Sequence, residues 1–84
     1  MIKLKNINLE NITIVEQIKK VGEEHCEFVT AIVSGDSSNA IEEFFDLVQA
    51  SLGALDKMGL SAEYVMQQYP KHLEKLKSRP RVKE

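Results

Sequence analysis

The fold is decided by residues 13–59, which read TIVEQIKKVGEEHCEFVTAIVSGDSSNAIEEFFDLVQASLGALDKMG. Apolar residues recur through this stretch at the three- and four-residue spacing of an amphipathic helix. Gly35 and Gly59 divide it, because glycine readily takes the left-handed conformation that ends a helix. The stretch therefore predicts two helices joined near residue 35.

The first helix is expected to start at Thr13 and to stop at residues 34–35. Thr13 and Glu16 have the spacing of a capping box, in which each side chain satisfies an amide of the first turn. We interpret His25 as a core or interface residue, and Cys26 as a packed side chain, because no base accompanies the thiol. The apolar positions of this helix are Ile14, Ile18, Val21, His25 (weakly), Phe28, Val29 and Ile32.

The second helix is expected to start at Ser38 or Asn39, where Asn39 and Glu42 repeat the capping-box spacing, and to end at Gly59. Its main apolar stripe, which includes Phe44 and Phe45 as core residues by position, consists of Ile41, Phe44, Phe45, Val48, Leu52 and Leu55. A linker of only about four residues favours antiparallel neighbours, so the two helices should form a hairpin.

The remaining chain predicts one or two C-terminal helices. Ser61 is a plausible N-cap, and Pro70 predicts either a kink or a short helix followed by a second one. Pro80 should end the helical part, which leaves residues 79–84 as a frayed tail. Residues 1–12 alternate apolar and polar side chains, and we interpret them as an N-terminal arm.

Length and composition limit what the protein can be. With 84 residues, the chain (1–84) should form a single domain of marginal stability, and one cysteine excludes an internal disulfide. Stabilisation is then expected from a metal, from oligomerisation or from both. A lone thiol and no signal-like N-terminus indicate a cytoplasmic setting. No apolar run approaches the ~20 residues of a membrane span.

Charge is distributed unevenly along the chain, although the net charge is only −2. Residues 10–56 contain ten acids and two bases, whereas the chain from Lys71 onward is mainly basic. This balance is too acidic for a nucleic-acid binder. An acidic body and a basic end suggest instead that a cation binds at one place and an anion at another.

Two acidic patterns carry the candidate chemistry. Residues 23–27 read EEHCE and residues 43–46 read EFFD. Residues three or four apart share a helix face, and in an antiparallel hairpin Glu27 and Glu43 lie at nearly the same height. Four carboxylates could then meet, and they would need a hard cation, for which oxygen ligands favour Mg²⁺ or Mn²⁺. The alternative is that these acids only line solvated helix faces.

The pattern of the second helix favours the hypothesis that the acids bind a metal. Glu43 and Asp46 lie opposite its apolar stripe, in line with the small residues Ala50, Gly53 and Ala54. A seam of small residues suggests that another helix approaches closely, so this helix should be covered on two sides. A partner subunit would supply one cover. The expected fold is therefore all-α, a helical hairpin completed into a four-helix-type bundle by oligomerisation.

These residues resemble the MazG-like members of the all-α nucleoside triphosphate pyrophosphohydrolase superfamily. The resemblance rests on EEHCE followed by EFFD, and on the pairs Ala31-Ile32 and Gly35-Asp36 before the second helix. It covers residues 18–59 and implies Mg²⁺-dependent hydrolysis of a nucleoside triphosphate to the monophosphate and pyrophosphate by a homodimer or homotetramer. It also implies that four carboxylates bind the metal: Glu24, Glu27, Glu43 and Asp46. Glu24 would in addition be catalytic, and Glu23 would be an auxiliary ligand or would orient the attacking water.

Further residues have more than one reading. An aromatic contact with the base could come from Tyr64 or Tyr69. The candidates for phosphate binding are Lys57, Lys75, Lys77 and Arg79. The last three belong to the basic tail, which could equally be only an exposed end of the chain. Two competing functions also stay open: a non-catalytic helical-bundle interaction protein related to this family, and a regulatory module that binds a metal without hydrolysis.

Overall fold

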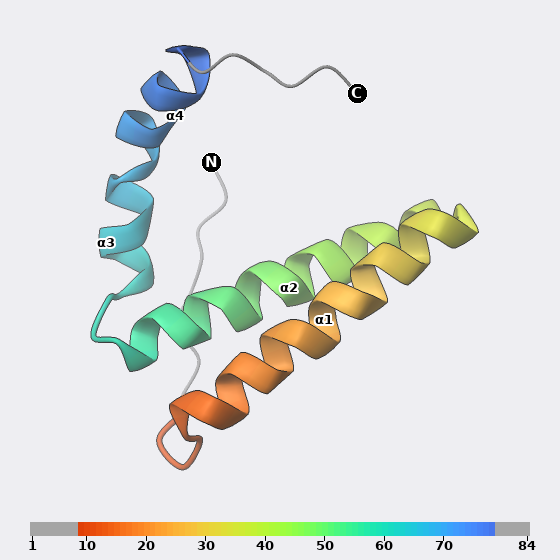
Figure 1. Ribbon diagram of the computed structural model, residues 1–84, viewed down its shortest axis with the longest axis horizontal. Coiled ribbons are helices and arrows are strands. Elements are labelled where there is room, and N and C mark those ends of the chain that lie inside the picture. Colours follow the sequence, from red (N-terminus) through yellow and green to blue (C-terminus); the bar gives the residue numbers. More distant parts are fainter. Residues whose placement is uncertain (1–8, 79–84) are drawn as a thin grey trace.

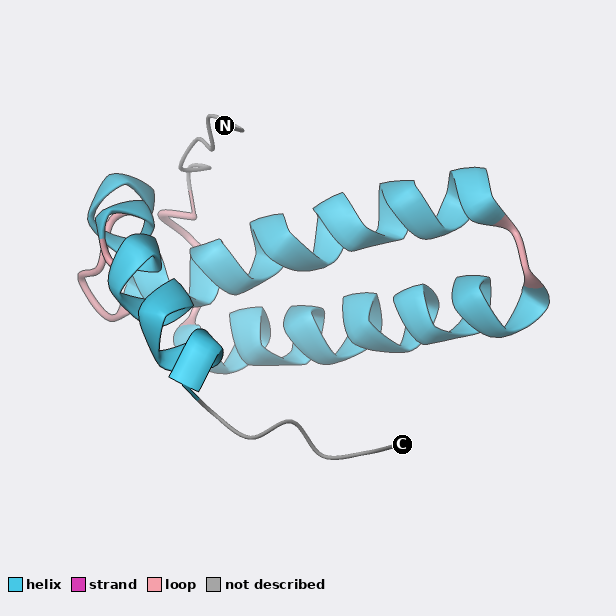
Figure 2. Cartoon of the chain, turned by 90° about the horizontal axis from the view of Figure 1, so that it is seen from above, coloured by secondary structure: helices cyan, strands magenta, loops and turns pink. Residues whose placement is uncertain are grey.

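The computed structural model describes residues 9–78, and all regular structure in that part is helical. Two long helices, α1 (Ile14–Ser34) and α2 (Ser37–Lys57), lie side by side and antiparallel (Figures 1 and 2). Two short ones, α3 (Ala62–Gln67) and α4 (Tyr69–Ser78), follow one another as a bent rod that projects from the end of α2. The predicted all-α fold, with a hairpin and two C-terminal helices, is confirmed.

Both ends of α1 lie where the sequence predicts them. The Glu16 amide donates to Thr13 Oγ1 at 3.1 Å, and the Thr13 amide donates to Glu16 Oε1 at 2.9 Å, which completes the capping box. Gly35 follows the helix with φ 74°, and its amide donates to the Ile32 carbonyl oxygen at 3.1 Å. A glycine is favoured there because side chains with a Cβ rarely adopt this conformation.

The predicted start of the second helix was wrong by one or two residues. Asp36 is the N-cap, and its carboxylate accepts a hydrogen bond from the Asn39 amide at 3.1 Å. Asn39 therefore lies inside the first turn, and the expected capping box with Glu42 is replaced by this contact. The connection between the long helices shortens to Gly35 and Asp36, which holds them antiparallel.

The C-terminal helices separate at Gln68, close to Pro70. Ser61 caps α3 by accepting a hydrogen bond from the Tyr64 amide at 3.1 Å, as predicted. Proline lacks an amide hydrogen and disfavours helical geometry in the preceding residue, so the helix restarts around it. Most of the predicted arm (residues 1–8) and the predicted tail (79–84) lie outside the described residues.

The buried residues of α1 are polar or small, and most of the predicted apolar stripe of this helix stays exposed. Ile18 and Ile32 are 58% and 55% exposed, and His25 and Cys26 are also exposed. His25 is therefore not a core residue of the described chain, and its alternative interpretation as an interface residue stays a prediction. The prediction that Cys26 is packed was wrong. The residues of the long helices that are buried are Gln17, Glu24 and Ala31 on α1, and Ala50, Leu52 and Gly53 on α2.

The apolar stripe of α2 is also incompletely covered within the described chain. Phe44 and Phe45 are 44% and 45% exposed, so their assignment to the core was wrong. They form an aromatic row with Phe28 of α1, with ring centroids 6.0 Å apart for Phe28 and Phe44 and 5.5 Å apart for the two neighbours on α2. The predicted seam of small residues is confirmed as a helix contact, and α1 of the same chain is the helix that fills it.

A buried side-chain hydrogen bond joins the two long helices. Gln17 on α1 donates from Nε2 to the Ala50 carbonyl oxygen on α2 at 2.9 Å, and both residues are buried. The neighbouring Gly53 leaves space for this amide, because a Cβ built at Gly53 would lie 2.7 Å from Gln17 Nε2. The bond satisfies a buried polar group whose desolvation would otherwise cost about 1–3 kcal/mol.

Gly22 offers the opposite case, and Gly22→Ala is expected to stabilise the protein. The residue lies in the middle of α1, is exposed, and a Cβ there would meet nothing within 4 Å. Alanine is favoured over glycine inside a helix by about 1 kcal/mol. Urea unfolding of the purified variant should show the gain. A loss of stability would mean that another surface packs on this turn.

Candidate metal centre

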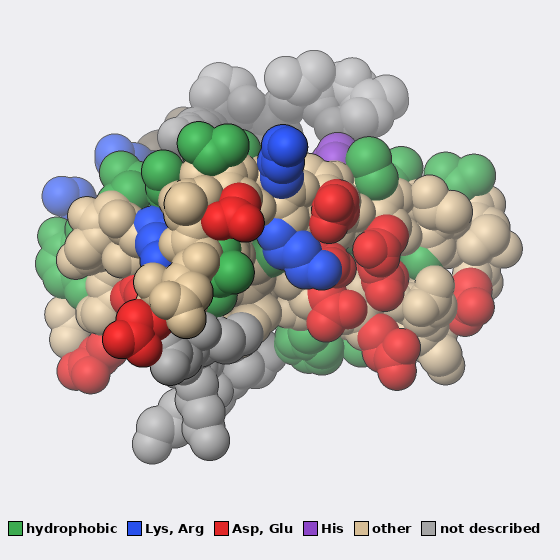
Figure 3. Space-filling view, turned by 90° about the horizontal axis from the view of Figure 1, so that it is seen from below, with side chains coloured by type: hydrophobic (Ala, Val, Ile, Leu, Met, Phe, Trp, Pro, Cys, Tyr) green, Lys and Arg blue, Asp and Glu red, His purple; other side chains and the backbone are tan. Residues whose placement is uncertain are grey.

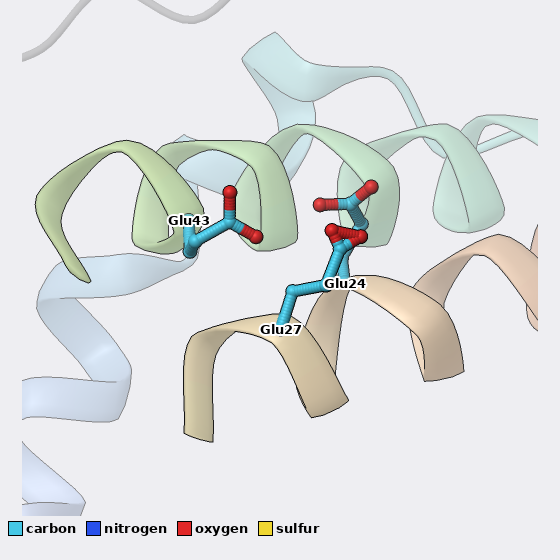
Figure 4. Close-up of side chains that lie close together, drawn as sticks. All are labelled: Glu24, Glu27 and Glu43. Carbon is cyan, nitrogen blue, oxygen red and sulfur yellow. The ribbon is translucent and has the colours of Figure 1, made fainter. Parts of the chain in front are cut away.

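Three carboxylates from the two long helices meet near the middle of the hairpin (Figure 4). Glu24 and Glu27 belong to α1 and Glu43 belongs to α2, and one oxygen of each lies within 4.8 Å of the others. Glu24 and Glu27 share a face because they are three residues apart, and the two-residue turn sets Glu43 opposite them. The close approach predicted from the two acidic patterns is thus realised for these three residues.

The cluster contains buried oxygen atoms that lack a partner. Glu24 is only 5% exposed, and Oε2 of Glu24 and Oε2 of Glu43 are buried with no hydrogen bond in the described structure. Burial raises the pKa of Glu43, and the nearby charges of Glu27, Asp46 and Glu24 raise it further. Carboxylates in such a position repel one another and lose hydration, so each oxygen needs a cation or a proton.

The donor set suits a hard divalent cation. All three side chains offer carboxylate oxygen, which is the donor that Mg²⁺ and Mn²⁺ prefer over softer ligands. The two buried oxygens without partners are the atoms that such an ion would satisfy. The residues present therefore fit a metal of this class.

Lys20 contacts the cluster, and sequence reasoning did not select it. Its Nζ lies 3.0 Å from Glu24 Oε1, one helical turn away on α1. The hydrogen bond to Glu24, followed by the charge of that carboxylate, raises the pKa of Lys20. The four-residue spacing between Lys20 and Glu24 was the signal that could have identified this pair.

Glu23 and Asp46 lie beside the cluster, not within it. Both line a pocket of about 730 Å³ together with Glu24, and both are exposed. Asp46 is close enough for its charge to act on Glu43. Figure 3 shows acidic side chains gathered on one face of the hairpin with basic side chains among them. The other residues that line this pocket are Leu9, Ile12, Glu16, Gln17, Lys19, Lys20, Gln49 and Ala50.

The predicted phosphate-binding residues are not brought to the cluster by the described chain. The Lys57 ammonium donates to the Leu9 carbonyl oxygen, which ties the segment before α1 to the end of α2. Lys75 and Lys77 are exposed on α4, which packs against α3 and makes no contact with the hairpin among residues 9–78. Arg79 lies outside the described residues, and the phosphate role of all four stays a prediction.

The raised pKa of Glu43 predicts a pH-dependent effect of Glu43→Gln in metal-free protein. A carboxyl whose pKa rises on folding destabilises the folded state above that pKa, and the effect vanishes as the pH falls below the ordinary carboxyl value. The variant should therefore be more stable than the parent near pH ~7 and lose this advantage near pH ~4.

Urea midpoints measured in EDTA at both pH values test this expectation. Glu42→Gln, which removes an exposed carboxylate from the same helix, is the matched control and should show no such dependence. If Glu43→Gln were more stable than the parent by the same amount at both pH values, the raised pKa of Glu43 could not be the cause of the gain.

The chain matches a known protein family. A family model described as phosphoribosyl-ATP pyrophosphohydrolase matches residues 4–72, which is most of the chain and includes every carboxylate considered above. No curated protein and no solved structure matches the chain. In the described residues, no helix is both long and apolar enough to cross a membrane.

Proposed function

The chain belongs to the phosphoribosyl-ATP pyrophosphohydrolase family, and we propose that it is a Mg²⁺-dependent enzyme that hydrolyses the triphosphate group of a nucleotide. The family is one of pyrophosphohydrolases acting on nucleotide derivatives and is a member of the all-α superfamily that the acidic patterns resemble. Phosphoribosyl-ATP, which the family description names, is the first substrate to test. The narrower MazG-like assignment stays a proposal.

The observation that carries this proposal is the carboxylate cluster with its two buried oxygens that lack partners. Glu24, Glu27 and Glu43 would hold the ion, with Asp46 beside them as a fourth ligand. When bound, the ion supplies charge neutralisation of the phosphate oxygens and helps to activate water. Two acids in the adjoining pocket, Glu23 and Glu24, are proposed to orient and deprotonate that water.

The proposed reaction breaks the anhydride bond between the α- and β-phosphates. Water oxygen bonds to the α-phosphorus, pyrophosphate leaves, and the water proton passes to solvent through the adjacent carboxylates. The products are the nucleoside monophosphate derivative and pyrophosphate. The pocket beside the cluster, at about 730 Å³, is within the usual range for small-molecule sites.

The exposed apolar stripes support the proposed assembly into a homodimer or homotetramer. Ile18 and Ile32 of α1 and Ile41 of α2 are each more than half exposed. These side chains would be covered if another subunit packed on this part of the hairpin. A cytoplasmic location is also proposed, on the basis of the single free thiol at Cys26.

Pyrophosphate release from a panel of nucleotides tests the function. The panel contains phosphoribosyl-ATP and canonical and modified nucleoside triphosphates, each assayed with Mg²⁺ and with EDTA. We expect release that requires Mg²⁺ and yields the monophosphate as the second product. Metal binding without release would favour the regulatory metal-binding module, and neither binding nor release would favour the non-catalytic helical-bundle interaction protein.

A further inference from the structure

The ammonium of Lys20 forms an ion pair with Glu24, the buried side chain of the cluster. Its partner, the Glu24 side chain, is 7% exposed, whereas the Lys20 side chain is 55% exposed, so the lysine reaches inward from the surface. The charges of Glu23 and Glu27 also act on this ammonium. Lys20 therefore pairs with Glu24, which is the most buried residue of the three in the cluster.

This pair stabilises the helix less than the reverse order of the two residues would. Lysine precedes glutamate here, which is the less favourable of the two orders at this spacing, because it aligns poorly with the helix dipole. A pair involving a buried carboxylate has another consequence: without its partner, Glu24 would be an uncompensated charge between two helices. The lysine thus supports the hairpin when no other cation binds Glu24.

Glu24 is also a proposed metal ligand. Lys20 Nζ holds its Oε1, and an ion would bind its buried Oε2, so two cations would meet on one carboxylate and repel each other. Lysine suits an exchange with the ion, since its charge sits on a flexible four-carbon stem and has no fixed bidentate geometry. Lys20 lines the pocket beside the cluster. An ammonium released from Glu24 would be available to the phosphate oxygens of a nucleotide held in this pocket.

We propose that Lys20 is the internal counter-ion of the metal-free centre and becomes a phosphate-binding residue when the centre is loaded. This inference rests on the proposed function, because it needs both the metal and the nucleotide. It assigns a binding role to a residue close to the carboxylates, in contrast to Lys75 and Lys77 on α4.

Lys20→Met tests the exchange through two binding measurements that do not depend on turnover. The first is Mn²⁺ affinity of the nucleotide-free protein, followed by calorimetry. Loss of the competing ammonium is expected to tighten Mn²⁺ binding roughly three- to tenfold. The second is the affinity for α,β-methylene-ATP, a non-hydrolysable analogue, in saturating Mn²⁺. Loss of the phosphate contact is expected to weaken it about tenfold.

The opposite signs of the two effects identify the exchange. A lysine that only supports the helix would leave both affinities unchanged or weaken both, and either result would overturn the inference. Lys71→Met, which removes a charge from α4, is the matched control and should change neither. If wild-type protein binds no Mn²⁺, the proposed function fails; if wild-type protein binds Mn²⁺ and Lys20→Met does not bind it more tightly, this inference alone fails.

Discussion

Pyrophosphate release is expected to fall by at least ~100-fold when Glu43→Gln and Asp46→Asn are combined. Even outer residues around metal sites commonly change activity by 10–100-fold, and these two carboxylates are proposed to contact the ion directly. Glu43 supplies a buried oxygen that has no protein partner, and Asp46 lies in the adjoining pocket. The amides keep the shape of the side chains and remove their charge, so the hairpin should still form.

The assay compares kcat/KM for a proven substrate with Mn²⁺ affinity in the same variant, and both should decline. Glu42→Gln with Asp56→Asn is the matched control, because it removes two carboxylates from the same helix but none from the cluster. Unchanged turnover in the Glu43 and Asp46 variant would refute the site assignment. Lost turnover with retained metal binding would leave these residues a role in catalysis and remove them from the ligand set.

Gly53→Ala should destabilise the protein by about 1–2 kcal/mol, although alanine is the better helix former. The new Cβ would lie 2.7 Å from Gln17 Nε2 and 2.8 Å from Leu9 Cδ1. Both atoms are at the ends of flexible side chains, so they can move aside. Gln17 can do so only by giving up its bond to the Ala50 carbonyl oxygen, and a buried amide would then lack a partner.

A double-mutant cycle with Gln17→Ala tests whether the lost hydrogen bond, and not a general cost of any larger side chain at this position of α2, destabilises the protein. In the Gln17→Ala background the amide is absent, so Gly53→Ala should be neutral or stabilising. Urea unfolding of the four proteins gives the coupling free energy. The same destabilisation in both backgrounds would show that the contact with Leu9, or another contact, sets the cost.

Local signals in the sequence predicted the helices well. The capping box at Thr13, the glycine at residue 35, the cap at Ser61 and the break near Pro70 each depend on a few neighbouring residues, and each is present. Only the start of α2 was misplaced, because Asp36 competes with Asn39 as an N-cap and both are favoured there. The prediction that Glu27 and Glu43 lie at nearly the same height along the hairpin followed from the rise per residue of a helix and from the short turn.

The faces of the helices were harder to predict than their ends. Periodicity identified which residues of α1 form an apolar stripe. Within the described chain, however, most of this stripe is exposed, and Gln17 and Glu24 face α2 instead. A hydrophobic pattern says which residues avoid water and does not say which surface covers them. The role of Lys20 was missed for a related reason, since its importance depends on the burial of Glu24.

The bond between Gln17 and Ala50 has a consequence for the alignment of the long helices. It joins them toward the open end of the hairpin, while residues 35–36 join them at the other end, and the carboxylates lie between the two attachments. Sliding one helix past the other by a single turn would shift the side chains by about 5.4 Å. That shift exceeds the 4.8 Å within which the three oxygens gather. The amide of Gln17 thus fixes the register of the two helices, and an uncharged contact preserves the spacing of the charged groups.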